Sequence, residues 1–370
     1  MKIGILTYHD TFNAGAFLQT FATYEYLKKT GLDVEVIDYV PKTGFIKEYK
    51  TKVITKQPLR GIRAILSQRK FLKNNLKLSS KRVISDSFDT SKKQLAGFDM
   101  LVVGSDTVFE VRPREKAFAP EIPNVYYLPA DLECKKVSFA ASADKSDFNL
   151  LNASQSKYLK DSLQNFSHLS VRDKFTQDSI SKIASVSSDL VFDPTFLIEF
   201  PSTGVKQKLT EIGKFAILNV ANKKFGKIVA NEYMRRGWKV VCPTKCGLAD
   251  VNLNGLINPL EWAELYKFAQ FTVTDRFHGT IFSLKANCPV LSIDDAIEYV
   301  NQTSKKEDML ARLDLISLLV DYKTVNEISQ NDVGKLIENT MKDWDYSKII
   351  NSLEMAANVS KNYWSKVLYD

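Results

Sequence analysis

The sequence predicts an α/β protein built from two Rossmann-like domains that face one another across a cleft. Apolar strands alternate with amphipathic helices in both halves of the chain, which is typical of parallel sheets covered by helices. The 370 residues exceed what one hydrophobic core usually supports. Residues 201–204 (PSTG) are typical of a linker. We therefore expect domains at residues 1–200 and 205–335, followed by a helical tail at 336–370.

The first half opens with a βαβ unit. Residues 2–7 read as a buried strand, residues 16–29 as a helix closed by Gly31, and residues 33–39 as a second strand. Later strands are expected at 98–103, 137–142 and 169–174, and a helix at 150–166. No G-x-G-x-x-G follows the first strand, so a dinucleotide is disfavoured.

Residues 42–95 interrupt this alternation as a basic helical insertion. Between residues 42 and 93 there are 15 Lys and Arg against three acids, so this segment carries +12 while the chain carries +8. Its apolar residues recur at helical spacing. The segment is either a packed helix with a solvated cationic face or a contact for an anionic membrane or lipid diphosphate. Few aromatic residues lie among the charges, so we expect no nucleic-acid binding.

The second half restarts the alternation. Strands are expected at 215–220, 238–241, 271–274 and 289–293, and helices at 225–236, 259–270, 281–286, 305–315 and 325–369.

The turn between residues 274 and 281 is the strongest candidate site. A strand-to-helix turn delivers its residues to the carboxyl edge of a sheet, where ligands bind. Gly279 and Thr280 are expected at the helix start, where backbone N–H groups favour an anion. Arg276 adds a fork-shaped cation and His278 a group that moves protons near neutral pH. Alternatively, Arg276 pairs with Asp275, and His278 is a hydrogen-bonded turn residue.

Polar residues follow two strands of the first half as well. Ser105 and Asp106 follow the strand at 98–103, and Asp106 is suited either to hold a sugar hydroxyl or to cap a turn. Arg172 follows a later strand, where an ordinary surface position beside Asp173 is one interpretation.

Five segments resemble, in order, the polysaccharide pyruvyl transferase family: NAGAFLQTFATYEYLKK from residue 13, VVGSDTVF from 102, SVRDK from 170, VFDPTFL from 191 and DRFHGTIFSL from 275. The resemblance covers roughly residues 1–295. It implies two Rossmann-like domains of the GT-B type. It also implies that Asn13, Gly15 and Gln19 contact substrate, while Ala14 replaces an aromatic residue of the family pattern.

The reaction that the resemblance implies uses phosphoenolpyruvate as co-substrate and needs no cofactor. Its three-carbon unit passes to two hydroxyls of a sugar, in a cell-surface polysaccharide or its lipid-linked oligosaccharide precursor, as a cyclic ketal. A general acid must protonate the enol carbon, and cations must hold the donor's carboxylate and phosphate. His278 suits the first role, and Arg276, Arg172, Gly279 and Thr280 suit the second.

Two other functions stay open. One is a glycosyltransferase that uses a nucleotide sugar, with its diphosphate bound by Arg276 and the helix start. The other is a carbohydrate-binding protein without catalysis, although binding alone needs no proton donor such as His278.

Composition also predicts location and redox chemistry. No signal peptide or membrane span is visible, so we expect a cytoplasmic protein, or one peripheral to the inner face of the membrane if the basic segment binds lipid. The four cysteines suggest no disulfide framework. Cys242 and Cys246 lack a second Cys/His pair at zinc-site spacing, so no metal is expected.

Overall fold

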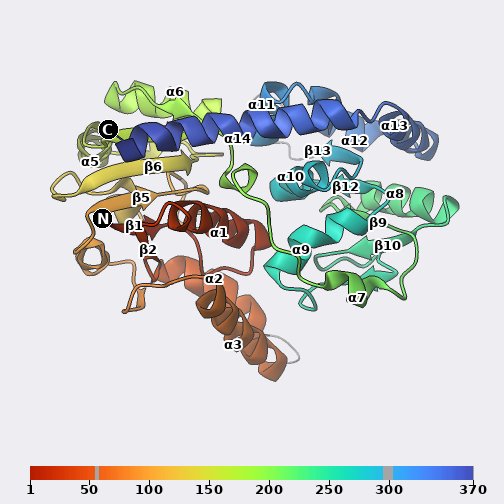
Figure 1. Ribbon diagram of the computed structural model, residues 1–370, viewed down its shortest axis with the longest axis horizontal. Coiled ribbons are helices and arrows are strands. Elements are labelled where there is room, and N and C mark those ends of the chain that lie inside the picture. Colours follow the sequence, from red (N-terminus) through yellow and green to blue (C-terminus); the bar gives the residue numbers. More distant parts are fainter. Residues whose placement is uncertain (55–57, 295–302, 370) are drawn as a thin grey trace. The chain divides into compact units, whose positions relative to one another are not determined.

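A computed structural model of the chain describes residues 1–54, 58–294 and 303–369. The chain forms two compact units, Met1–Ile198 with Ala357–Asp370, and Glu199–Ala356 (Figure 1). Each unit is a parallel six-stranded sheet with flanking helices. The expected Rossmann-like architecture of both halves is confirmed. The chain passes from the first unit to the second between Ile198 and Glu199, close to the expected linker.

The sheet of unit 1 has the strand order β2-β1-β5-β6-β7-β8. Its strands are β1 (Lys2–Leu6), β2 (Asp33–Val36), β5 (Met100–Val103), β6 (Lys135–Ala141), β7 (His168–Val171) and β8 (Asp189–Leu190). Its helices include α1 (Ala14–Lys28), α5 (Ala153–Gln164) and α6 (Lys174–Ala184), with 3₁₀ turns η2 (Val125–Tyr127), η3 (Phe148–Leu150) and η4 (Pro194–Phe196). The strand order reverses at β1 and β5, so the carboxyl ends of these two strands form the switch point of the sheet.

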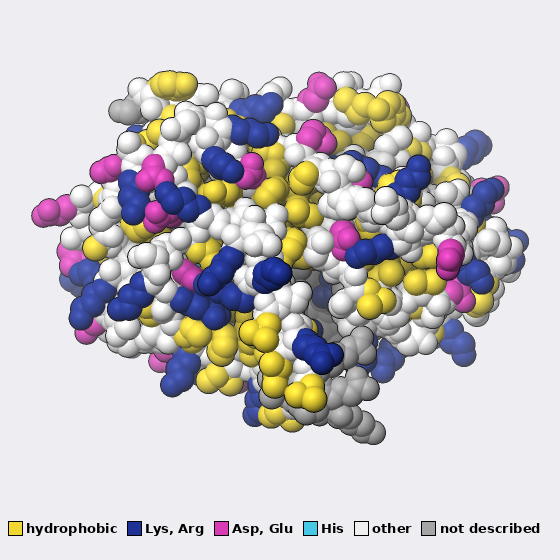
Figure 2. Space-filling model, turned by 60° about the horizontal axis from the view of Figure 1, so that its bottom comes forward, with side chains coloured by type: hydrophobic (Ala, Val, Ile, Leu, Met, Phe, Trp, Pro, Cys, Tyr) yellow, Lys and Arg dark blue, Asp and Glu magenta, His cyan; other side chains and the backbone are white. Residues whose placement is uncertain are grey.

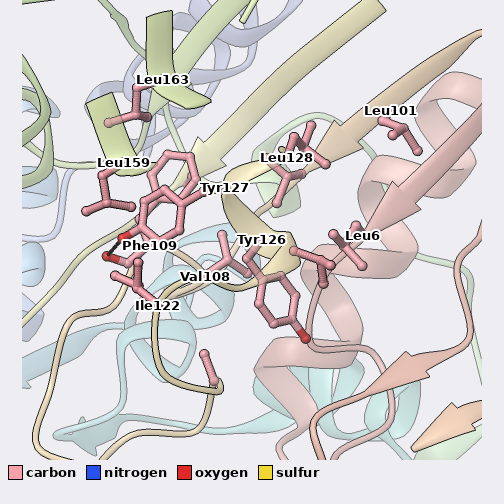
Figure 3. Packing of buried hydrophobic residues seen from close by; sticks show 14 of the residues in the cluster. Leu6, Leu101, Val108, Phe109, Ile122, Tyr126, Tyr127, Leu128, Leu159 and Leu163 are labelled. Carbon is pink, nitrogen blue, oxygen red and sulfur yellow. Dashed lines mark hydrogen bonds between the residues drawn. The ribbon is translucent and has the colours of Figure 1, made fainter. Parts of the chain in front are cut away.

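The core of unit 1 anchors the segment that follows β5. Phe109 and Tyr127 are fully buried, with stacked rings 4.9 Å apart, and the Tyr127 hydroxyl donates to the Phe109 carbonyl at 2.8 Å (Figure 3). Leu159 and Leu163 of α5 belong to the same cluster. Phe109 therefore fixes the loop that carries Asp106 to the core.

The insertion contains more than the expected helices. Its elements are β3 (Tyr39–Val40), α2 (Lys42–Val53), α3 (Pro58–Asn75), β4 (Val83–Ile84), α4 (Phe88–Lys92) and η1 (Lys93–Leu95). Strands β3 and β4 pair in parallel as a separate small sheet. The sequence did not reveal these strands because two residues are too few to show an alternating pattern.

The sheet of unit 2 has the order β11-β10-β9-β12-β13-β14, the order of the dinucleotide-binding fold. Its strands are β9 (Phe215–Asn219), β10 (Lys239–Cys242), β11 (Val251–Asn252), β12 (Thr272–Thr274), β13 (Val290–Ile293) and β14 (Leu319–Val320). Its helices are α7 (Val205–Leu209), α8 (Lys223–Arg235), α9 (Pro259–Leu265), η5 (Tyr266–Phe268), α10 (Phe277–Lys285), α11 (Lys305–Arg312), η7 (Ile316–Leu318), α12 (Tyr322–Glu327) and α13 (Gln330–Lys342). The switch point lies between β9 and β12.

The long helix α14 (Tyr346–Tyr369) belongs to both units. Ser352 donates to the Leu313 carbonyl of unit 2 at 2.9 Å, whereas the Tyr363 hydroxyl donates to the Ser138 carbonyl of unit 1 at 2.7 Å. The expected tail is therefore part of the two cores rather than an appendage. Among the described residues, no helix is long and apolar enough to cross a membrane.

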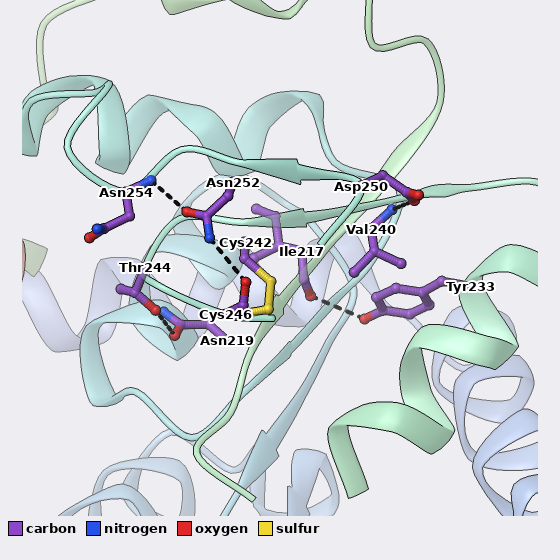
Figure 4. Close-up of a disulfide and its surroundings, with 10 residues drawn as sticks. All are labelled: Ile217, Asn219, Tyr233, Val240, Cys242, Thr244, Cys246, Asp250, Asn252 and Asn254. Atoms are coloured by element: carbon purple, nitrogen blue, oxygen red, sulfur yellow. Dashed lines mark hydrogen bonds between the residues drawn. A yellow bond between two sulfur atoms is a disulfide. The ribbon is translucent and has the colours of Figure 1, made fainter. Parts of the chain in front are cut away.

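The structure adds a feature that the sequence reasoning did not anticipate, because Cys242 and Cys246 form a local disulfide (Figure 4). Cys242 ends β10, and the following loop folds back so that the two sulfurs meet. Thr244 of this loop donates to the Asn219 side chain at 2.7 Å, and Asn252 donates to the Cys246 carbonyl at 3.0 Å. The number of cysteines argues against a framework of several disulfides, but it does not exclude a single disulfide between two cysteines that are close in sequence.

Candidate functional site

The switch point of unit 2 holds the turn that the sequence singled out. The Asp275 amide donates to the Asn219 carbonyl at 3.0 Å, which joins the carboxyl ends of β12 and β9. The Asp275 carboxylate accepts from the Ala221 amide at 2.6 Å. Both strand ends are thus held together at the place where open α/β sheets bind their ligands.

Arg276 and His278 project from this fixed turn. Arg276 is the N-cap residue of α10, and its Nε lies 3.0 Å from the Asp275 carboxylate. The ion pair between Arg276 and Asp275, which was the alternative interpretation of this turn, is therefore present. Even so, 56% of the Arg276 side chain stays exposed. His278 is half-buried in the first turn of α10, with its ring edge-on to Phe277. Arg276 thus offers an accessible cation two residues before His278 at the start of the same helix.

Helix α10 begins at Phe277, four residues before the expected range, so Gly279 lies in its first turn and Thr280 follows. The Thr280 amide already donates to the Arg276 carbonyl at 3.1 Å, and the buried Thr280 hydroxyl pairs with Ser292 at 2.8 Å. The Thr280 amide is thus committed to the helix. A Cβ at Gly279 would lie 2.6 Å from the Thr274 hydroxyl oxygen, so glycine here allows the helix to pack on β12. The N–H groups without intrahelical acceptors precede Thr280.

Lys306 was missed by the sequence reasoning. Its ammonium donates to the Asp275 carbonyl at 3.0 Å and to the Ile293 carbonyl, and it lies 2.7 Å from the Asp294 carboxylate. Lys306 and Asp294 are both buried. The pair ties the ends of β12 and β13 together behind the Arg276 turn. Nothing in the sequence marks Lys306, because it lies 31 residues beyond Asp275 on another helix.

Ser105 and Asp106 lie at the switch point of unit 1, but their side chains differ in solvent exposure. The Thr7 hydroxyl donates to the Ser105 carbonyl at 2.7 Å, which joins the ends of β1 and β5. The Ser105 hydroxyl donates to the Ala140 carbonyl at 2.8 Å and is fully buried. Asp106 is partly exposed and has a left-handed backbone with φ of 84°. That conformation is uncommon outside glycine, and of the two side chains only that of Asp106 is accessible.

The residues of α1 are largely committed to the fold. Asn13 is the N-cap, its side-chain oxygen accepts from the Gly15 amide at 3.0 Å, and Gly15 is buried. Gln19 is fully buried and accepts from the Arg172 guanidinium at 3.0 Å. Arg172 also pairs with the Asp193 carboxylate at 2.8 Å and is 4% exposed. The structure thus brings Gln19 and Arg172 together, but as an inward-facing pair neutralised by Asp193.

A cluster of ionised side chains near the β1–α1 loop was also missed. Asp10 accepts from Arg82 at 2.6 Å and from the Tyr49 hydroxyl at 2.7 Å. Asp38 accepts from Arg69 and lies 3.2 Å from the His9 imidazole. Arg69 and Arg82 come from the insertion, so part of its charge is used to fasten the insertion to this loop.

Glu48 is a carboxyl group of unit 1 whose pKa lies near neutrality. Burial raises the pKa of Glu48 to about 7, against a hydrogen bond from the Phe12 amide at 3.0 Å that lowers it. The charge of Asp10 adds to the rise. The Phe12 amide that donates to Glu48 directly precedes Asn13, the N-cap residue of α1. Glu48 therefore contacts the loop between β1 and α1, at the switch point of unit 1. No group of three or more His, Cys, Asp or Glu that could hold a metal occurs among the described residues.

Residues 13–295 match the polysaccharide pyruvyl transferase family. The chain belongs to this family. Membership makes it a transferase that acts on polysaccharide. No curated protein sequence matches the chain significantly.

Solved structures show the same fold at low sequence identity. The chain resembles the UDP-GlcNAc 2-epimerase of Neisseria meningitidis with a TM-score of 0.54 and 10% identity, covering all of both chains. It resembles the UDP-GlcNAc 2-epimerase of Methanocaldococcus jannaschii with a TM-score of 0.52 and 11% identity, again over all of both chains. These likenesses confirm the two Rossmann-like units of the GT-B type.

Proposed function

We propose that this family member transfers the enolpyruvyl unit of phosphoenolpyruvate to a sugar of a cell-surface polysaccharide, or of its lipid-linked precursor, as a ketal. The observation that supports it most is that Arg276, the N-cap residue of α10, and His278, in the first turn of that helix, both follow β12 at the β9/β12 switch point. A guanidinium suits the donor's carboxylate or phosphate, and an imidazole suits a proton transfer.

In this proposal the imidazolium of His278 donates its proton to the methylene carbon of the donor. The neighbouring carbon becomes cationic and is attacked by the first sugar hydroxyl. Its bond to the phosphate oxygen then breaks, and the second hydroxyl closes the ketal. The two hydroxyls lose two protons in all: one restores His278 and the other leaves with phosphate, so atoms and charge balance.

In this proposal, Asp275 and Lys306 hold Arg276 in the orientation that the donor requires. Lys306 holds the Asp275 carbonyl, and Asp275 in turn braces the Arg276 guanidinium through Nε. Arg276 thus meets the donor with its orientation already set, which favours electrostatic stabilisation of the transition state. Asp106 at the unit 1 switch point is the proposed contact for a sugar hydroxyl.

The test is to incubate the protein with phosphoenolpyruvate and candidate sugar or sugar-lipid acceptors. Phosphate release must accompany an acceptor mass gain equal to the enolpyruvyl unit. A parallel arm supplies UDP-sugars in place of phosphoenolpyruvate. Glycosyl transfer in that arm alone would establish the glycosyltransferase alternative. Acceptor binding without turnover in either arm would leave a carbohydrate-binding protein.

A further inference from the structure

The outward face of α2 and α3 exposes large apolar side chains. Leu59 is 72% exposed and Leu66 is 65% exposed. Ile46, Ile54 and Ile62 are exposed as well. Scattered single exposures of this kind are ordinary, but five large apolar side chains within 21 residues are an unusual concentration, and exposed apolar surface that is concentrated in one place marks interaction sites.

The exposed residues of α3 follow helical spacing. Leu59, Ile62 and Leu66 recur every three or four residues, and exposed Lys70 and Lys73 continue the same row. Figure 2 shows hydrophobic and Lys/Arg side chains next to one another in the lower middle of the view, where this part of unit 1 comes forward. The face is thus apolar toward the start of α3 and cationic toward its end.

Helices α2 and α3 contain one acidic residue between them. Helix α3 contains no Asp or Glu. The one acid of α2, Glu48, accepts from the Phe12 amide and so turns toward the sheet. Arg69 turns inward and donates to Asp38, so it helps to hold the fold together. Lys70 and Lys73, in contrast, face outward. A solvated cationic face accounts for the exposed Lys70 and Lys73 of α3, but it gives no reason for the exposed leucine and isoleucine side chains that begin the same row.

We propose that the outward face of α2 and α3 docks on an anionic lipid bilayer. Leu59, Ile62 and Leu66 enter the boundary between headgroups and acyl chains, while Lys70 and Lys73 meet the lipid phosphates. Burying apolar area and pairing cations with anionic lipid are the two contributions that hold an amphipathic helix at a membrane surface. The inference is independent of the proposed transfer reaction, since it rests on this face alone.

Vesicle sedimentation tests the docking without any substrate. The full-length protein is mixed with vesicles of phosphatidylcholine containing phosphatidylglycerol, or of phosphatidylcholine alone. We expect pelleting with the anionic vesicles that weakens as salt rises, because surface charges are screened within about 10 Å at 0.1 M salt. Lys70→Gln/Lys73→Gln should weaken binding about fivefold per lysine. Leu59→Gln/Leu66→Gln should weaken it more than tenfold, including at high salt.

Matched controls come from exposed residues of unit 2. Met234→Gln/Leu256→Gln removes two exposed apolar side chains, and Lys223→Gln/Lys224→Gln removes two exposed lysines. Both should pellet like the wild type. All four substituted pairs are exposed, so unfolding is not expected to obscure the comparison.

Three results would overturn the proposal. Equal pelleting of the wild type and both α3 variants places any lipid contact elsewhere. No pelleting of the wild type with anionic vesicles removes the bilayer as partner. Light scattering that shows a dimer lost in Leu59→Gln/Leu66→Gln, without vesicle binding, assigns the face to a second copy of the chain.

Discussion

Arg276 and His278 lie one residue apart, but their surroundings give them separable roles. Arg276 is braced on Asp275 and largely exposed, whereas His278 is half-buried against Phe277. We expect Arg276→Lys to keep the charge but lose the planar fork, raising KM for phosphoenolpyruvate more than it lowers kcat. His278→Gln should lower kcat about 10²–10⁴-fold with little change in donor binding. Steady-state kinetics with titrated donor binding separates the two.

The pH–rate profile provides the control for His278. One limb should vanish in His278→Gln if the imidazole supplies the proton. A variant with near-normal turnover and an unchanged profile would instead assign His278 a structural or phosphate-contacting role. Asp106 would then be the next proton donor to examine.

Gly104 tests the packing of the unit 1 switch point. Its φ is +108°, and a Cβ would lie 2.4 Å from the Phe139 carbonyl oxygen. Gly97 also has a positive φ, +81°, but a Cβ there would meet nothing within 4 Å. Gly97→Ala should therefore cost about 1–2 kcal/mol of unfolding free energy from backbone strain alone. Gly104→Ala should cost about 4 kcal/mol or more, because backbone atoms must also move.

Urea unfolding at constant temperature measures both glycine variants. The midpoint should fall much further for Gly104→Ala, with an unchanged slope. Equal losses for the two variants would mean that β6 can yield at Phe139.

At the scale of elements, the sequence predicted most strands to within a few residues but not their order. Apolar runs reveal a strand, whereas strand order depends on contacts between distant segments. The turn at Arg276 was found because a strand end and a helix start adjoin in sequence. Lys306 was not, because its partner Asp275 is distant in sequence. Arg172 could not be recognised as buried, since its neutralising partner Asp193 lies on a later segment.

The attachment of α3 to the β1–α1 loop should depend on pH. Burial would raise the pKa of Asp38, but hydrogen bonds from His9 and Arg69 outweigh it and lower the pKa to about 2. In the unfolded chain the Asp38 carboxyl has its ordinary pKa of about 4, so it takes up a proton at a higher pH than in the folded protein. The contribution of Asp38 to the unfolding free energy is therefore present above about pH 4 and is lost as pH falls toward 2. We expect the unfolding free energy of the wild type to drop across this window more steeply than that of Asp38→Asn.

The exposed Asp314 provides the comparison for Asp38. Its side chain is 88% exposed and pairs with Lys348 at the surface. Asp314→Asn should keep the wild-type slope between pH 4 and 2. A wild-type slope in Asp38→Asn would show that the Asp38 cluster does not hold α3 in solution.

At the scale of the whole molecule, α14 makes the stability of unit 1 depend on the end of the chain. The first 198 residues build its sheet, but residues 357–370 complete its core. Trp364 is fully buried, with its ring 4.9 Å from that of Phe139 in β6. Lys135 of the same strand donates to the Val367 carbonyl at 2.6 Å. Unit 1 can therefore reach its full stability only when α14 is folded against β6.

Trp364→Ala should lower the unfolding free energy of unit 1 by about 3–5 kcal/mol, because it leaves a large cavity against β6. Tyr369→Ala, at a side chain that is 88% exposed on the same helix, should change it by less than about 0.5 kcal/mol. Hydrogen exchange resolves the two units within one protein. In Trp364→Ala the amides of β5, β6 and β7 should exchange much faster, while those of β9 and β12 keep their protection. Equal acceleration in both sheets would mean that the two units unfold as one, so that α14 couples them rather than completing unit 1 alone.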